Sequence, residues 1–293
     1  MTNEFAFLPH ETINDIVELA GVERNKPHAR INHEHLIQVD GPWGDFARHA
    51  APIMLFSNEI VSRNCKEFSY AEETPLTFEE AGNRPISYCK IGTHVDVNVL
   101  RKAAPYLNES IEIRDAPRIP GDVLDSIGNR FSCVTWSEQA YLNPAIQEEM
   151  AEFLKRQLRS KYLRSFIFCS NRIENKEFND LLIEFVKKPT FERLIGMDST
   201  YISAQVFLAA DQAWRSRSSF EVGTQEIKGL VTLESFNALA AQVEITWDRT
   251  SSRPHPTVPS ARQIVIAQMK KKHAHGVPAH HVTAKFSNNF FVE

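Results

Sequence analysis

A short apolar pattern recurs along the chain from residue 86 onward. A hydrophobic residue is followed by others three and five positions later, and the residues between them alternate with the period of two that a β-strand requires. The segments that carry it are Ile86, Cys89 and Ile91; Ile111 and Ile113; Phe131, Val134 and Trp136; Leu163, Phe166 and Phe168; Phe191 and Leu194; Phe220 and Val222; and Ala240, Val243 and Ile245. The step between segments is about 21 to 32 residues, which suits one strand plus one helix. Because a unit of that size cannot bury its own apolar face, we expect the units to stack and to present a surface to a partner.

Segments with helical spacing lie between these strands. They cover residues 95–107, 120–129, 143–158, 175–186, 203–214 and 233–240. Strands joined through helices cannot form hairpins, so we expect them to lie parallel. After a loop at 253–260, strands at 264–266 and 282–286 are expected to form a hairpin that covers the end of the sheet. The pattern therefore predicts an α/β fold, a strand-helix solenoid with a parallel sheet and a C-terminal hairpin cap.

The chain before residue 86 has helical rather than strand spacing. Apolar residues recur at three and four positions within 8–21 and within 36–47, and a further helix is predicted from Ile53 to Val61. The stretch that follows is polar with little periodicity, as in a linker. We therefore expect a helical module at 1–50, a linker with a cap helix at 51–85 and a repeat domain at 86–293.

Composition narrows the range of partners and compartments. The 293 residues carry a net charge of −4, so the chain has no basic field that would attract nucleic acid. The four cysteines form no CxxC pair, which is typical of reduced thiols in the cytosol or nucleus. No stretch approaches the roughly 18 apolar residues of a membrane span, so no membrane association is expected.

The N-terminal module resembles an F-box, the helical module that docks substrate receptors onto the adaptor subunit of cullin-RING ubiquitin ligases. The residues that match are Leu8, Pro9 and Glu11 at the head, Ile13 and Ile16 in the first helix, Leu36, and then Val39, Trp43 and Ala47 at intervals of four. The rest of the chain resembles the leucine-rich-repeat-like domain that often follows an F-box, in a form with few leucines and no Asn column. The resemblance implies a non-catalytic substrate-recognition subunit of an SCF-type E3 ligase.

The same resemblance implies an adaptor-binding surface in the first fifty residues. Its members are Leu8, Pro9, Ile13, Ile16, Val17, Leu36, Val39 and Trp43. Each large apolar side chain buried in an adaptor groove contributes about 1.5 to 3 kcal/mol before ordering costs. We expect Trp43 to be the anchor, because aromatic side chains tend to dominate interfaces.

A second surface is expected on the repeats, where residues between the core positions must point to the other side of the sheet. The target-binding candidates on it are Thr135, Ser137, Ile167, Cys169, Ile195, Met197 and Glu244. Their apolar middle and polar flanks are typical of a partner site. The alternative is that a loop or the C-terminal tail covers this face.

No motif in the chain indicates catalysis. It lacks a glycine-rich phosphate loop, GxSxG, HExxH and a recognisable Cys–His frame, so we expect neither an enzyme nor a cofactor. His273, His275, His280 and His281 lie near one another, but no cysteine or carboxylate accompanies them, and we expect no metal site.

Two other functions stay open at this point. Relative to an F-box, the loop between head and tail is longer by about eight residues, and Gly41 and Pro42 replace helical residues before Trp43. The chain could therefore be a stand-alone interaction scaffold whose degenerate F-box serves as the N-terminal cap of the repeats. An unrecognised hydrolase is the third reading, since catalytic geometry leaves no fixed trace in one sequence.

Overall fold

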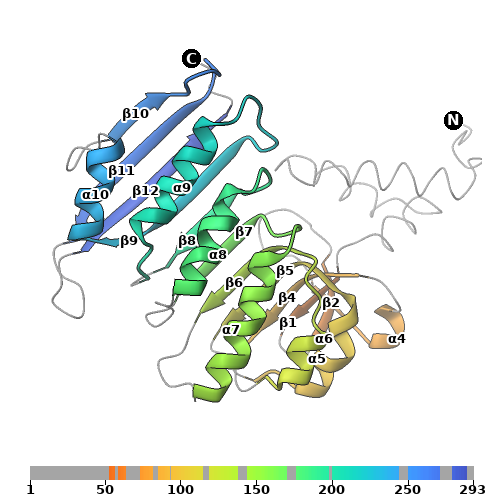
Figure 1. Ribbon diagram of the computed structural model, residues 1–293. Coiled ribbons are helices and arrows are strands. Elements are labelled where there is room, and N and C mark those ends of the chain that lie inside the picture. Colours follow the sequence, from red (N-terminus) through yellow and green to blue (C-terminus); the bar gives the residue numbers. More distant parts are fainter. Residues whose placement is uncertain are drawn as a thin grey trace, which may run out of the picture. The chain divides into compact units, whose positions relative to one another are not determined.

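The computed structural model describes residues 53–56, 59–63, 73–81, 85–92, 94–114, 119–137, 144–169, 176–197, 200–243, 250–270 and 279–288. The chain forms two compact units, Met1–Cys89 and Lys90–Glu293 (Figure 1). The boundary between them falls inside strand β4 (Ile86–Ile91). Each unit is described by itself below.

The described part of the first unit is built from strands and one helical turn. An antiparallel hairpin joins β1 (Ile53–Phe56) and β2 (Glu59–Arg63), and β2 pairs in turn with β3 (Glu73–Leu76), which precedes α4 (Phe78–Ala81). The helix predicted from Ile53 to Val61 was therefore wrong. Ile53 and Leu55 are both buried while Met54 between them is partly exposed, which is the alternation of a strand. A short apolar run does not distinguish a strand from a helix by periodicity alone.

The second unit alternates strands with helices, as predicted. Its strands after β4 are β5 (Leu107–Arg114), β6 (Phe131–Ser137), β7 (Ser165–Cys169), β8 (Arg193–Gly196), β9 (Thr224–Thr232), β10 (Thr250–Pro254), β11 (Arg262–Lys270) and β12 (Ala279–Ser287). Its helices are α5 (Val97–Ala103) with a 3-10 turn at Ala104–Tyr106, α6 (Gly121–Ser126), α7 (Pro144–Arg159), α8 (Lys176–Lys187), α9 (Ala204–Arg215) and α10 (Leu233–Val243). Each predicted helical segment of this region corresponds to one of these helices.

The strands of the second unit form a sheet in the order β10-β11-β12-β9-β8-β7-β6-β5. Strands β5 to β9 run parallel, each beside its neighbour in sequence, which confirms the predicted parallel arrangement. Beyond β9 the pairing turns antiparallel, from β9 to β12, from β12 to β11 and from β11 to β10. The predicted hairpin of β11 and β12 is confirmed, but the outer strand is β10, whose Arg253 and Pro254 lie in the segment predicted as a loop.

Two of the predicted strands were wrong. Phe220 and Val222 lie in the bends before β9, and Ala240 and Val243 lie in α10, while Ile245 lies outside the described residues. In β9 the apolar pattern is broken by Gln225, a buried side chain whose amide donates a hydrogen bond of 2.8 Å to the Phe191 carbonyl. A polar residue thus occupies an inward position, and the strand begins later than the apolar spacing suggested.

Helices α5 to α10 all lie on one face of this sheet (Figure 1). The central covered row comprises Ile111, Val134, Phe166, Leu194 and Ile227, which are register partners from strand to strand and are all fully buried. Buried side chains of the helices pack on these rows, for example Phe178 against Phe166 and Phe168. The core of the unit is this single interface between sheet and helices.

The carbonyl groups at the carboxyl ends of successive helices accept hydrogen bonds from side chains that lie on, or just after, the next helix. Arg156 donates to the Leu124 carbonyl of α6, and the Lys188 ammonium donates to the Leu158 and Ser160 carbonyls at the end of α7, at 2.6 and 2.8 Å. Arg217 donates to the Lys187 and Lys188 carbonyls at the end of α8, both at 2.9 Å. Cations at these positions satisfy orphan carbonyls and oppose the negative end of the helix dipole.

The end of α9 is capped in the same way by a neutral histidine. The Nδ1 atom of His255 lies 3.1 and 3.0 Å from the backbone N–H groups of Thr257 and Val258, so it accepts from both. The proton is therefore on Nε2, which donates to the Trp214 carbonyl at 2.8 Å. The turn after β10 thus supplies to α9 the cap that residues on or after the next helix supply to α6, α7 and α8.

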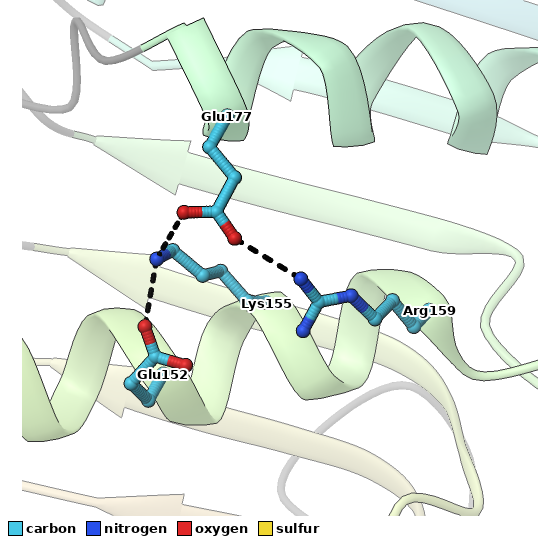
Figure 2. Close-up of polar contacts among 4 residues, drawn as sticks. All are labelled: Glu152, Lys155, Arg159 and Glu177. Atoms are coloured by element: carbon cyan, nitrogen blue, oxygen red, sulfur yellow. Dashed lines mark hydrogen bonds and ion pairs between the residues drawn. The ribbon is translucent and has the colours of Figure 1, made fainter.

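Neighbouring helices are also joined on their outer surfaces. Glu177 of α8 accepts from Lys155 and Arg159 of α7 at 2.7 and 3.1 Å, and Lys155 also contacts Glu152 at 2.7 Å (Figure 2). The contact with Lys155 lowers the pKa of the Glu177 carboxyl, and the Glu152 and Glu177 carboxylates raise the pKa of Lys155. These ion pairs fix the spacing of α7 and α8 at the surface.

Candidate interaction surface

The sheet face opposite the helices, called the open face here, is the candidate functional surface. Its central row runs through Glu112, Thr135, Ile167, Ile195, Lys228, Thr283 and Ile266, each the register partner of the next. Paired residues of neighbouring strands point to the same face, so these side chains lie side by side. All of them are partly exposed, whereas the covered row of their sequence neighbours is buried.

An aliphatic patch lies on the parallel half of the open face. Ile167 and Ile195 are paired at its centre, and Cys169 and Met197 follow them by two positions on their own strands. Cys133 lies on the neighbouring strand, two positions before Thr135, which is the register partner of Ile167. A second aliphatic pair, Ile264 and Ile266, lies on β11. Partly exposed aliphatic side chains flanked by polar ones are typical of a protein-binding surface.

A basic strip runs across the strands that carry the two aliphatic regions and across the two strands between them. It comprises Arg193 of β8, Lys228 of β9, Lys285 of β12 and Arg262 of β11, with Glu226 as the carboxylate within it. Glu226 forms an ion pair of 3.6 Å with Lys285. Among the residues that the structure describes, no carboxylate lies within ion-pair distance of Arg193, Lys228 or Arg262.

Two further cations at the β4 and β5 end of the face share one carboxylate. Glu112 contacts the Arg114 guanidinium at 2.6 Å and the Lys90 ammonium at 4.0 Å. Among the described strand residues of the open face, the cations with no ion-pair partner are therefore those of β8, β9 and β11, beside the aliphatic patch.

Most of the target-binding residues predicted from sequence come together on this face. Thr135, Ile167 and Ile195 occupy one row, Ser137 and Cys169 are paired two positions further along their strands, and Met197 directly follows β8. Glu244 lies outside the described residues. The alternative of a covering tail is not realised by residues 279–288, which form β12 within the sheet and not a layer over it.

The adaptor-binding residues predicted in the N-terminal module lie outside the described residues. They are Leu8, Pro9, Ile13, Ile16, Val17, Leu36, Val39 and Trp43. Their docking role stays a prediction.

Sequence reasoning missed the antiparallel part of the open face. Lys228, Thr283 and Ile266 continue the row of Ile195, but β9 was predicted several residues too early and β12 was not expected beside it. The alternation of Gln225, Ile227 and Gly229 with the charged residues Glu226 and Lys228 carries the signal for β9. Reading that alternation would have placed Lys228 on the same face as Ile195.

Two thiols of the sheet, those of Cys89 and Cys133, are not activated. Burial raises the pKa of the Cys133 thiol, and burial raises the pKa of Cys89 to about 12. Thiolates are the reactive form of cysteine, so neither residue is set up as a nucleophile at neutral pH.

Other sites of possible chemistry are limited. Within the described ranges, no three His, Cys, Asp or Glu side chains gather so as to hold a metal ion. His280 and His281 point to opposite faces of β12, with His280 buried against Phe236, while His273 and His275 lie outside the described residues. None of the described helices is long and apolar enough to cross a membrane.

One open cleft, of about 480 Å³, lies between α9, α10 and the turn after β10. Its buried carboxylate, Asp211, is paired with Arg253 at 3.0 Å, and burial raises its pKa. Arg253 also contacts Gln263 at 2.6 Å, so this group ties β10 and β11 to α9. The arrangement is that of a structural anchor of the outermost strand.

No family model, curated protein or solved structure matches this chain. The functional argument therefore rests on the residues themselves and on the geometry of the open face.

Proposed function

We propose that this chain is the substrate-recognition subunit of a cullin-RING, SCF-type E3 ubiquitin ligase. In this proposal the F-box-like head docks the adaptor, the leucine-rich-repeat-like unit holds a target protein, and ubiquitin transfer belongs to other subunits. The chain needs no cofactor and acts in the cytosol or nucleus. Its contribution is proximity, since it brings a target to the transferring machinery.

The observation that carries the proposal is the open face. Helices cover one side of the sheet, and the other side presents a row of partly exposed side chains across several strands. The apolar residues on the inner side of the helices pack on the covered face to form the core. The open face is therefore not needed for that packing and can bind a partner. Its aliphatic patch with charged flanks suits a protein partner.

The adaptor half of the proposal is tested by a pull-down of purified adaptor with the full chain. We expect the wild-type chain to retain the adaptor and Trp43→Ala to lose it, because Trp43 is the proposed anchor. The matched control is Tyr162→Ala, which removes an aromatic side chain that is 46% exposed on the repeat unit. If the wild-type chain recovers no adaptor, the receptor proposal is wrong and the stand-alone scaffold remains.

The target half is tested with Ile167→Asp and Ile195→Asp in the full chain. Proteins recovered from cells by the wild-type chain are expected to be lost from both variants, while adaptor binding persists. Leu233→Asp is the matched control, because Leu233 is 42% exposed in α10 on the helix layer. Loss of the adaptor together with the target would indicate a folding defect and not a binding defect.

A further inference from the structure

The open face differs in charge from the chain as a whole. The chain carries a net charge of −4, yet cations outnumber carboxylates on the open faces of β8, β9, β11 and β12. The basic strip of Arg193, Lys228, Lys285 and Arg262 holds one carboxylate, Glu226, which is already paired with Lys285. This surface therefore carries net positive charge, although the net charge of the whole chain is negative.

The strip lies directly beside the aliphatic patch. Lys228 is the register partner of Ile195, and Arg193 precedes Ile195 by two positions on the same strand and therefore shares its face. Cross-strand neighbours lie about 5 Å apart, so a ligand side chain seated on Ile195 is within reach of both cations. A partner that covers the patch must also provide negative charge or leave these cations desolvated without a counter-ion.

We propose that the open face binds an acidic segment of its target, in which aliphatic residues are flanked by Asp, Glu or phosphorylated side chains. The aliphatic residues pack on Ile167 and Ile195, and the anionic groups pair with Arg193 and Lys228. Arg262 extends the same preference toward Ile264 and Ile266. This inference rests on the proposed function, because it takes the open face as the target site.

The ligand chemistry favours protein over nucleic acid. A phosphate backbone needs a broad positive field, whereas here the cations form a narrow strip between aliphatic side chains within a chain of net negative charge. Aromatic side chains on which bases could stack are absent from the central row of the open face. The aliphatic neighbours of the strip are better suited to Leu, Ile or Val side chains of a peptide.

The test is a selection of random twelve-residue peptides, displayed on phage, against the immobilised full chain. Peptides that bind the wild-type chain are expected to be enriched in Asp and Glu next to aliphatic residues. The double variant Arg193→Glu with Lys228→Glu is expected to weaken binding of a selected peptide by at least about 10-fold and to select Lys and Arg instead. Affinity for the wild-type chain should also fall as salt rises, since the contacts are exposed.

The matched control is Lys176→Glu with Lys187→Glu, which makes the same change in net charge on α8, away from the open face. It is expected to leave peptide binding within about twofold, because charges separated by more than a Debye length are screened. A single-stranded oligonucleotide serves as a second probe. Binding of the oligonucleotide in preference to the peptides would overturn the inference.

The remaining outcomes separate this inference from the proposed function. If Ile195→Asp abolishes peptide binding but the charge reversal does not, the open face is a docking site and the acidic preference is wrong. If neither change affects binding, or if no peptide family is enriched, the open face does not bind a linear segment and the inference fails. Adaptor binding, measured on the same variants, reports separately on the receptor proposal.

Discussion

The two faces of the repeat sheet are built from alternate residues of the same strands, but they differ in how far their side chains are buried. On the covered face Val134, Phe166 and Leu194 are fully buried beneath helices, and on the open face Thr135, Ile167 and Ile195 stay partly exposed. In our proposal neighbouring residues therefore carry different duties, stability on one side and recognition on the other. Substitutions one position apart can separate these duties.

The largest difference in the free energy of unfolding is expected between alanine variants of Phe166 and Ile167. Phe166→Ala removes a fully buried ring that packs on Phe168 and Phe178, and we expect it to lower the free energy of unfolding by about 3 to 5 kcal/mol. Ile167→Ala removes a partly exposed side chain and should cost about 1 kcal/mol. Urea unfolding of both variants measures the difference, and equal losses would show that the open face is also part of the core.

The next effect concerns the caps that hold the helix layer on the covered face. Lys188→Met keeps the aliphatic stem but removes the ammonium that binds the Leu158 and Ser160 carbonyls. Hydrogen bonds to charged groups contribute about 1.5 to 3 kcal/mol, so we expect a loss in that range. Lys187→Met on the same helix is the control, since its side chain is exposed. A loss no greater than that of the control would mean that water satisfies these carbonyls equally well.

A smaller contrast is expected between Lys228 and Gly229 of β9. A Cβ atom at Gly229 would lie 2.7 Å from Cδ1 of Ile202, so Gly229→Ala forces the covered face apart at a cost of about 1 to 3 kcal/mol. Lys228→Ala on the open face should change stability by less than about 0.5 kcal/mol. Thermal unfolding followed by circular dichroism compares the two, and a strongly destabilised Lys228→Ala variant would contradict an open face free of structural duty.

The smallest effect is expected on the outer surface of the helices. The folded-state pKa of Glu177 is lowered by Lys155, so its ion pairs add stability above the ordinary carboxyl pKa, and this is lost as pH falls through the folded-state pKa. Glu177→Gln should therefore melt slightly lower than wild type at pH 7 and equally at acid pH. Glu148→Gln, an exposed position of α7, is the control. The difference at pH 7 should shrink in about 1 M salt.

Much of the repeat unit follows from apolar spacing alone. Helices α7, α8 and α9 have long amphipathic patterns, and their ends agree with the prediction to within a residue or two. The parallel order of β5 to β9 follows from the helix between each pair of strands. Alternation within strands also predicts that Thr135, Ile167 and Ile195 share a face, as the register of β6, β7 and β8 confirms.

The remainder depends on contacts that local spacing does not encode. In β9 a buried glutamine replaces an apolar residue because it binds a carbonyl of the neighbouring strand, and Gly229 leaves room for Ile202. The insertion of β12 beside β9 depends on long-range pairing, and β10 is held by Arg253 and Asp211. For this reason the sequence revealed the aliphatic patch but not the basic strip beside it.

The caps of α6, α7 and α8 all come from residues that lie later in the sequence than the helix they cap. Each carbonyl end of α6, α7 and α8 is completed by a residue 28 to 32 positions further along the chain. During synthesis the carbonyl groups of the last turn of each of these helices therefore gain their capping side chain only after the next helix has been made. Truncation directly after α6, α7 or α8 would remove the side chain that caps that helix and leave its last turn frayed, whereas the end of α9 is capped by the uncharged His255.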